Sequence, residues 1–188
     1  PQDQNQPITN EVPNLPNCRI IFFEKFADHS VEDYWIPTDA PNYTGAWQIQ
    51  ELELPQTSPH ENGLVCKSRN SYSAISTKFN DPISIINETL VLQYEMRPQL
   101  AFTCSGPYIK LFSDKNFEPR DLTNETRYTI MFGPDRCGPS KKMHFIFNYF
   151  HPKRHIYMQK SMKQTHKSII SVPIDVYNHL YTLIVRPN

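Results

Sequence analysis

Proline is the residue that most restricts how this chain can fold, because it is frequent and spread along the whole length. The 188-residue sequence holds 17 prolines and only 5 glycines. A proline ring removes a backbone donor and disfavours helix interiors and central strands, so such a chain favours many turns and short strands. Tyrosine, phenylalanine, isoleucine, valine and threonine are plentiful and alanine is scarce, which is typical of strands. The sequence therefore predicts a β-rich fold.

The composition argues against several classes of protein. Hydrophobic residues make up 38% of the chain and aromatic residues 12%, which is enough for a packed core and argues against wholesale disorder. The 19 Lys and Arg residues balance the 19 Asp and Glu residues, and a neutral chain without a basic run is a poor nucleic-acid binder. No stretch approaches the roughly 20 apolar residues of a membrane span. The N-terminus lacks the pattern of a signal peptide, as a mature secretory protein also would.

Segments with strand character recur along the chain. They are residues 19–26, 45–52, 63–66, 72–79, 90–96, 108–112, 127–132, 143–149 and 179–185. Turn signals separate them, including one at residues 133–135, and about ten short strands at this spacing predict a two-sheet antiparallel sandwich. Residues 152–174 are basic and irregular, so we expect a surface excursion there. Residues 1–17 are polar and proline-broken and are predicted to form a flexible lead-in, with residues 18–188 forming a single domain.

Cysteine and sequon patterns bear on the cellular compartment. The four cysteines are Cys18, Cys66, Cys104 and Cys137. No pair has C-x-x-C spacing, which argues against a zinc site, and the even count permits two disulfides, one or none. Three N-x-S/T sequons, at residues 42–44, 87–89 and 124–126, give modest support for a secretory route, where disulfides persist. For Cys18 and Cys66, a second bridge and buried or semi-buried free thiols are equally compatible with the sequence.

The segment from residue 104 to residue 138 carries the most chemical information. It holds three of the five glycines, and glycine serves positions that need unusual dihedrals or close approach. A bridge between Cys104 and Cys137 would close a loop of about 34 residues, which the chain-entropy model equates with roughly 3–4 kcal/mol. It would also bring four polar side chains near one another. These are Tyr108, Lys110, Tyr128 and Asp135.

These four side chains have the chemistry of a site for a neutral oligosaccharide. Sugar hydroxyls need rigidly held donors and acceptors, which an ammonium, a carboxylate and phenol hydroxyls provide. The C–H faces of a pyranose pack on flat apolar surfaces such as tyrosine rings and a methionine. The alternative is that both tyrosines lie at the edge of the core and that Lys110 is a solvated strand lysine, and composition alone favours that alternative.

Several blocks of the sequence resemble the calnexin/calreticulin family. The most specific of them is the run I-M-F-G-P-D-R-C-G at residues 130–138. Similar blocks are residues 104–111, 128–138, 144–149 and 179–185, with weaker similarity at residues 22–26, 45–47, 63–65 and 72–76. The block at residues 152–157 is more similar to calnexin than to calreticulin. The resemblance extends over nearly everything after residue 18.

The resemblance implies an all-β, antiparallel, legume-lectin-like (concanavalin-type) β-sandwich of jelly-roll topology. It implies a calcium-associated lectin chaperone of the endoplasmic reticulum lumen that binds monoglucosylated high-mannose N-glycans on folding glycoproteins, together with unfolded proteins. Members also recruit a disulfide isomerase through a proline-rich arm. Matched residue by residue, the sugar-contacting positions fall on Tyr108, Lys110, Tyr128 and Asp135, a packing position at the same site falls on Met131, and the family disulfide falls on Cys104 and Cys137.

The sequence departs from the family pattern at two places. A calnexin-type glutamate that contacts the sugar falls on Gln159, by counting from Cys137, and a neutral amide lacks the stronger charge-assisted bond. The family's last sugar-contacting acid and its calcium-ligating aspartate follow the proline-rich arm, before which this chain ends. We therefore expect the arm and its isomerase partner to be missing and the sandwich to be incomplete. Calcium, expected at residues 59–63, should bind weakly or not at all. The calnexin-like block favours a membrane-anchored parent.

Two other functions compete with the lectin. A glycoside hydrolase needs two carboxylates that flank the scissile bond, and the one i, i+2 acid pair on a strand candidate, Glu51 and Glu53, lies outside residues 104–137. We therefore expect no enzymatic activity. The main alternative is a glycan-independent, protein-binding chaperone module with a degenerate sugar site. His144 and His179 lie on strand candidates, and we expect both to be structural histidines with satisfied hydrogen bonds.

Overall fold

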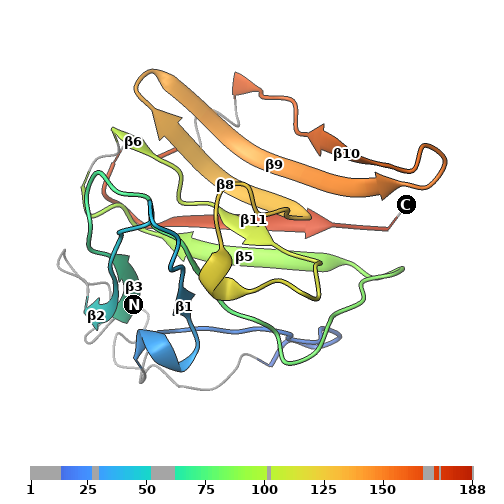
Figure 1. The fold of residues 1–188 in the computed structure, drawn as a ribbon, viewed down its shortest axis with the longest axis horizontal. Coiled ribbons are helices and arrows are strands. Elements are labelled where there is room, and N and C mark those ends of the chain that lie inside the picture. The colour runs from blue at the N-terminus through green and yellow to red at the C-terminus, as the bar shows by residue number, and fades with distance from the viewer. Residues whose placement is uncertain are drawn as a thin grey trace, which may run out of the picture. The chain divides into compact units, whose positions relative to one another are not determined.

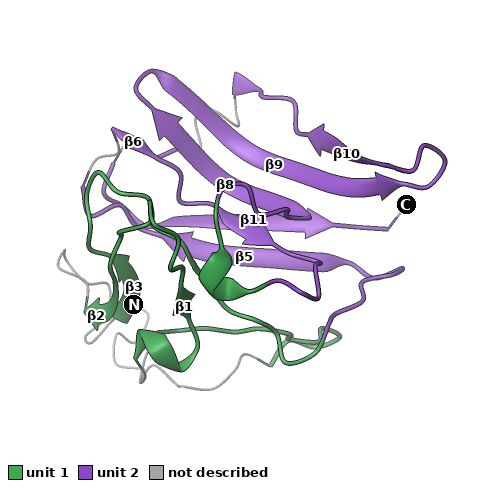
Figure 2. Cartoon of the chain, viewed as in Figure 1, with its two compact units in different colours: residues 1–81, 118–123 green, residues 82–117, 124–188 purple. Residues whose placement is uncertain are grey.

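The chain folds into antiparallel β-structure. The computed structural model describes residues 14–26, 30–51, 62–100, 103–166, 172–173 and 175–187. Residues 1–81 with 118–123 form one compact unit, and residues 82–117 with 124–188 form a second (Figure 2). The short helices η1 (Val31–Asp33) and η2 (Pro119–Asp121) are 3-10 turns. Within the described ranges, no helix has the length and apolar character that crossing a bilayer requires.

The first unit contains two strand pairs and a buried polar contact to η2. Strand β1 (Ile36–Pro37) pairs with β4 (Ile75–Ser76), and β2 (Trp47–Glu51) pairs with β3 (Asn62–Cys66). The buried hydroxyl of Thr38 lies 2.9 Å from the carbonyl oxygen of Arg120 and 2.7 Å from that of Leu122. This contact fixes η2 next to the end of β1.

The second unit contains two antiparallel sheets (Figure 1). The larger sheet has the strand order β10 (Ile156–Ser161), β9 (Ser140–His151) and β8 (Ile130–Cys137), followed by β6 (Cys104–Ser105) and β7 (Ile109–Leu111). Both β6 and β7 pair with the same edge of β8. The smaller sheet pairs β5 (Leu90–Met96) with β11 (His179–Val185).

A hydrophobic core links the two sheets of the second unit. Its buried members are Ile130, Phe132, Met143, Tyr181 and Leu183. Alternate residues of β5 pack against them, and the rings of Tyr94 and Tyr181 stack with centroids 5.4 Å apart. Burial of each large apolar side chain contributes about 1.5–3 kcal/mol, so this core holds the larger sheet in place. The opposite face of the larger sheet points away from the core, because successive side chains in a strand alternate between its two faces.

Most strand predictions are confirmed, and two of them match residue for residue. Residues 90–96 and 179–185 form β5 and β11 with the predicted limits. The segments at 45–52, 63–66, 108–112, 127–132 and 143–149 each overlap a strand of the structure. The all-β, antiparallel class is therefore correct. The predicted lead-in at residues 1–17 lies mostly outside the described residues.

The predicted turn at residues 133–135 is wrong, because these residues continue β8. Gly133 and Pro134 pair with His144 and Met143 of β9 on one side. On the other side of β8, the pairing with β7 ends at Phe132 and the pairing with β6 begins at Arg136, so residues 133–135 have no partner strand there. Proline is tolerated where its missing N–H is not needed for a ladder, and Pro134 lies between the two ladders.

Three further predictions need correction. Residues 152–174 are not wholly irregular, since Ile156–Ser161 form β10 at the edge of the larger sheet. Nearly all its side chains are exposed, so no alternation of apolar and polar residues marks it in the sequence. Residues 19–26 form no strand; the Phe22 ring packs edge-on against Trp35 at 5.9 Å, and Phe26 has a left-handed backbone with φ of 57°. Of residues 72–79, only Ile75–Ser76 form a strand.

Candidate functional site

The face of the larger sheet that points away from the core carries the predicted sugar-binding residues. Lys110 of β7 lies opposite Met131 of β8, which lies opposite Ile146 of β9. Met131 alternates with the core residues Ile130 and Phe132 and lies outside their cluster, although its side chain is buried as well. Directly opposed residues of an antiparallel pair share a face, so Lys110 and Met131 project together. Asp135 lies four residues along the same strand and therefore faces the same way.

Lys110 lies between two aromatic rings. Its Nζ is 4.9 Å from the centroid of the Tyr128 ring and 5.9 Å from that of Tyr108. The side chain is half-buried, and burial lowers the pKa of the ammonium below its usual 10.5, an effect that the negative charge of Glu125 partly offsets. The two π-faces and Glu125 therefore hold a cation that is partly stripped of water.

Tyr128 is held at the end of the face near β10. The Asn148 side-chain amide donates a hydrogen bond of 3.0 Å to the Tyr128 carbonyl oxygen. The Gln159 amide Nε2 lies 3.5 Å from the Tyr128 hydroxyl. Gln159 pairs with Asn148 across β10 and β9. Gln159, a departure from the family pattern, thus lies on the same surface as Lys110 and Tyr128.

Asp135 and Tyr108 meet at a histidine that the sequence analysis left out of the site. His144 Nε2 lies 3.0 Å from Asp135 Oδ2. The His144 ring packs edge-on against Tyr108 with centroids 6.0 Å apart. His144 therefore has a hydrogen-bond partner, as we expected, but that partner is a candidate sugar ligand. Alternation along residues 143–149 was visible in the sequence, whereas the register that sets His144 beside Asp135 was not.

Gly133 allows the backbone before β7 to approach β8. Its φ is +140°, in a region that side chains disfavour. A Cβ atom at Gly133 would clash with the Tyr94 hydroxyl and would lie 2.8 Å from Tyr108 Cα. The Tyr94 hydroxyl in turn donates a 2.9 Å hydrogen bond to the carbonyl oxygen of Pro107. Tyr108 is therefore positioned by close backbone packing as well as by His144.

A disulfide closes the end of this face. Cys104 and Cys137 are opposed across β6 and β8 and form the bond expected from the resemblance. The Gly138 N–H donates a 2.9 Å hydrogen bond to the Thr103 carbonyl oxygen beside it. Cys18 and Cys66 are free thiols, so the second bridge is absent, but both are exposed and not buried or semi-buried as the free-thiol alternative expected.

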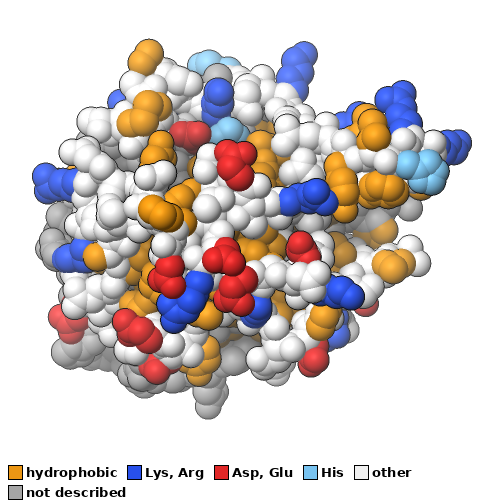
Figure 3. All heavy atoms as spheres, viewed as in Figure 1, with side chains coloured by type: hydrophobic (Ala, Val, Ile, Leu, Met, Phe, Trp, Pro, Cys, Tyr) orange, Lys and Arg blue, Asp and Glu red, His pale blue; other side chains and the backbone are white. Residues whose placement is uncertain are grey.

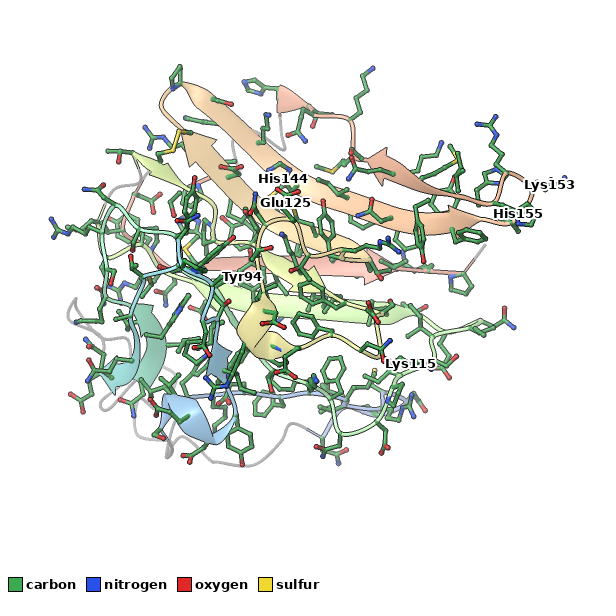
Figure 4. All side chains as sticks on the ribbon, viewed as in Figure 1. Tyr94, Lys115, Glu125, His144, Lys153 and His155 are labelled. Carbon is green, nitrogen blue, oxygen red and sulfur yellow. A yellow bond between two sulfur atoms is a disulfide. The ribbon has the colours of Figure 1, made fainter. Side chains whose placement is uncertain are left out.

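An open pocket lies at the β10 end of the face. Its lining includes Asn124, Glu125, Arg127, Tyr128, Tyr157 and Gln159. The Arg127 guanidinium lies 4.1 Å from the centroid of the Tyr157 ring, so this wall of the pocket also combines a cation with a π-face. Figure 4 labels His144 and Glu125 on this unit. The pocket adds polar and aromatic groups to those around Lys110.

Charged side chains of both signs are mixed on the surface of the described residues that Figure 3 shows, in keeping with the balanced charge of the sequence. Among the described residues, no group of three or more His, Cys, Asp or Glu side chains could hold a metal ion. The loop expected to bind calcium, residues 59–63, is described only from residue 62 onward.

The arrangement suits recognition of a polyhydroxylated ligand. It offers an ammonium donor, a carboxylate acceptor, an amide and phenol groups that can do both. The tyrosine rings supply apolar surface between these groups, and Met131 is buried beneath them. The structure brings together on one face all six residues that the sequence analysis nominated, namely Tyr108, Lys110, Tyr128, Met131, Asp135 and Gln159.

Comparisons with known proteins agree on one family. A family model described as the calreticulin family matches residues 22–188. Calmegin of Bos taurus is 40% identical over 147 residues, which is 78% of this chain and 24% of the relative. A calnexin homologue of Schizosaccharomyces pombe is 32% identical over 197 residues, covering 100% of this chain and 34% of the relative.

A solved structure supports the same relationship. The globular domain of Trypanosoma cruzi calreticulin superposes with a TM-score of 0.71 at 26% identity, covering 89% of this chain and 59% of that one. The chain spans between 24% and 34% of the length of these curated relatives.

Proposed function

This chain belongs to the calreticulin family, and from that premise we propose that its second unit is a lectin surface for glucose-capped high-mannose N-glycans. The observation that carries the proposal is the position of Lys110. Its ammonium lies between the rings of Tyr108 and Tyr128, on the same face as Asp135. This combination of a charged donor, a charged acceptor and flat apolar surfaces suits a neutral sugar.

Each side chain takes a definite role in the proposal. Lys110 donates hydrogen bonds to hydroxyls of the terminal sugar, and Asp135 accepts them. The rings of Tyr108 and Tyr128 pack against the C–H faces of the sugar, and the buried Met131 side chain packs beneath the site. Gln159 donates and accepts through its amide, in place of the family's glutamate.

The cellular role follows from the family. A lectin of this kind would retain unfinished glycoproteins in the lumen of the endoplasmic reticulum until they fold. Binding of a disulfide isomerase would need the family's proline-rich arm. The proposal is one of binding without catalysis, and no step of it runs through calcium.

A second candidate is the glycan-independent chaperone module. It is favoured by exposed apolar side chains at the turn between β9 and β10, where Phe150, Ile156 and Tyr157 are 49%, 51% and 57% exposed. Contiguous apolar groups on a surface can mark a site for protein contact. The two functions make different predictions for the same ligand panel.

An array of high-mannose glycans with and without the terminal glucose separates these functions. The lectin proposal predicts selective binding of the glucose-capped members, with loss of binding in Lys110→Met. An unglycosylated, unfolded protein serves as the second ligand. Retention of that protein without any glycan binding would refute the lectin and support the module.

A further inference from the structure

We propose that Asn124 carries an N-linked glycan and that this glycan limits access to the candidate sugar site. The proposal rests on the lectin function above. The sequence Asn124-Glu125-Thr126 is a glycosylation sequon. A glycan there would make the site partly self-occluding in a chain made along the secretory route.

The local structure around Asn124 is compatible with a bulky attached group. Asn124 and Glu125 lie in an exposed turn before β8. The Asn124 amide nitrogen Nδ2 donates a 2.8 Å hydrogen bond to the carboxylate of Glu125, which is exposed as well. N-linked glycans require a surface position of this kind. Replacing one amide hydrogen with a sugar therefore disturbs no buried packing.

Asn124 differs from the other two sequon asparagines in its position. It lines the pocket that Tyr128 and Gln159 also line. Asn42 and Asn87 are exposed too, but neither is among the residues that line this pocket. Asn42 moreover belongs to the first unit, whereas the pocket belongs entirely to the second. A glycan on Asn124 therefore starts inside the candidate site, and glycans on the other two do not.

The modification step is an ordinary condensation with a lipid-linked oligosaccharide pyrophosphate. Nδ2 of Asn124 forms a bond to the anomeric carbon of the first sugar and loses one proton. The bond between that carbon and the pyrophosphate oxygen breaks, and the lipid pyrophosphate leaves with the electron pair.

The attached sugars would compete with ligand for the pocket. A tethered group acts on its neighbourhood at an effective concentration of the order of mM for a short link. Asn124, Tyr128 and Gln159 line the same pocket, so the first attached sugars would occupy space that an incoming glycan needs. Lys110, the rings beside it and Asp135 stay unchanged, so the intrinsic affinity of the site is not altered.

The experiment compares variants of the full chain expressed in a eukaryotic secretory pathway. Mass spectrometry of the peptide that contains Asn124 measures occupancy, and calorimetry with a glucose-capped mannose oligosaccharide measures affinity. Asn124→Gln and Thr126→Ala both remove the sequon through different side chains, whereas Thr126→Ser keeps it. We expect the first two to bind about fivefold or more tightly than the wild-type chain, a ratio at the lower end of measured couplings between sites. Thr126→Ser should match the wild type.

Asn42→Gln and Asn87→Gln are the matched controls and should leave affinity at the wild-type level. The unglycosylated wild-type chain from bacteria should match Asn124→Gln. An unmodified Asn124, or equal affinity in the occupied wild type and the two sequon-removing variants, would overturn the inference alone. Failure of the bacterial chain to bind the oligosaccharide at all would overturn both this inference and the lectin function.

Discussion

The imidazole of His144 and the carboxylate of Asp135 form a pair, with Nε2 and Oδ2 3.0 Å apart. The same imidazole packs against the ring of Tyr108. One side chain thus contacts two of the proposed sugar ligands, although it was assigned a purely structural role from the sequence. His144 is therefore a positioning residue of the proposed site.

Replacement of His144 with alanine should weaken glycan binding without abolishing it. Asp135 and Tyr108 would lose a neighbour that restricts them, and a hydrogen bond to a charged group contributes about 1.5–3 kcal/mol. Calorimetry should show a loss of affinity within that range, with partial recovery in His144→Gln. His179→Gln is the control, because His179 pairs with Asp175 at 2.7 Å on the other sheet. Equal losses in both histidine variants would refute the positioning role.

Glycan binding should be lost at a lower alkaline pH than it would be if Lys110 had the usual pKa of a lysine. Burial lowers the pKa of Lys110 below 10.5. As the pH rises, the ammonium donor therefore loses its proton earlier than an exposed lysine would. The free energy of unfolding changes in the opposite direction. Between the lowered pKa of Lys110 and 10.5, the unfolded chain binds more protons than the folded chain, so the contribution of Lys110 to stability rises with pH.

Removal of the Glu125 charge should shift the alkaline limit of binding. Glu125 raises the pKa of Lys110 against the effect of burial, so Glu125→Gln should move the loss of binding to lower pH. Glu95→Gln is the control, because Glu95 is exposed on the smaller sheet. Affinity measured across the alkaline range gives the midpoint for each variant. An unchanged midpoint in Glu125→Gln would contradict the assignment of Lys110 as the titrating donor.

Loss of the disulfide should destabilise the chain and loosen the site together. Cys104 and Cys137 enclose about 34 residues, and a loop of that size corresponds to roughly 3–4 kcal/mol. Urea unfolding of the Cys104→Ser, Cys137→Ser double variant measures this cost, and calorimetry measures the expected weaker binding. Cys18→Ser with Cys66→Ser is the control, because both thiols are free and exposed. Undiminished affinity in the first double variant would show that the bridge does not order the site.

Gly133→Ala should be more damaging than Gly138→Ala. Both glycines have positive φ, but a Cβ at Gly138 meets no atom within 4 Å. The strain at Gly138 alone should cost roughly 1–2 kcal/mol. At Gly133 the added atom also clashes with Tyr94 and the backbone of Tyr108, so both stability and glycan affinity should fall further. Equal unfolding free energies of the two variants would contradict this reading of the close approach.

The strands with regular alternation could be predicted from the sequence, and the others could not. Residues 90–96 and 179–185 alternate in burial, and their limits were found correctly. Strand β10 is almost wholly exposed, so its composition resembles that of a loop. The Gly133-Pro134 pair carries a strong turn signal, yet the gap between β6 and β7 lets both residues remain in β8.

The residues of the candidate site were predicted from the family resemblance. Their arrangement relative to one another depends on the register in which β7, β8 and β9 pair, and the sequence does not give that register. Sequence spacing does not place Lys110 on the same face as Met131 and Asp135, because β7 and β8 could pair in more than one register. His144 was missed for the same reason. The exposed state of Cys18 and Cys66 was also beyond the sequence, since exposure depends on tertiary packing.

The most direct test of the lectin function is calorimetry of the unglycosylated chain with a glucose-capped mannose oligosaccharide, using Lys110→Met and Lys115→Met. Methionine keeps an unbranched apolar stem and removes the charge at both positions, and Lys115 is exposed in a loop after β7 (Figure 4). We predict a loss of roughly 1.5–3 kcal/mol for Lys110→Met, the range of a hydrogen bond to a charged group, and no change for Lys115→Met. Equal affinity in the wild type and both variants would contradict the account.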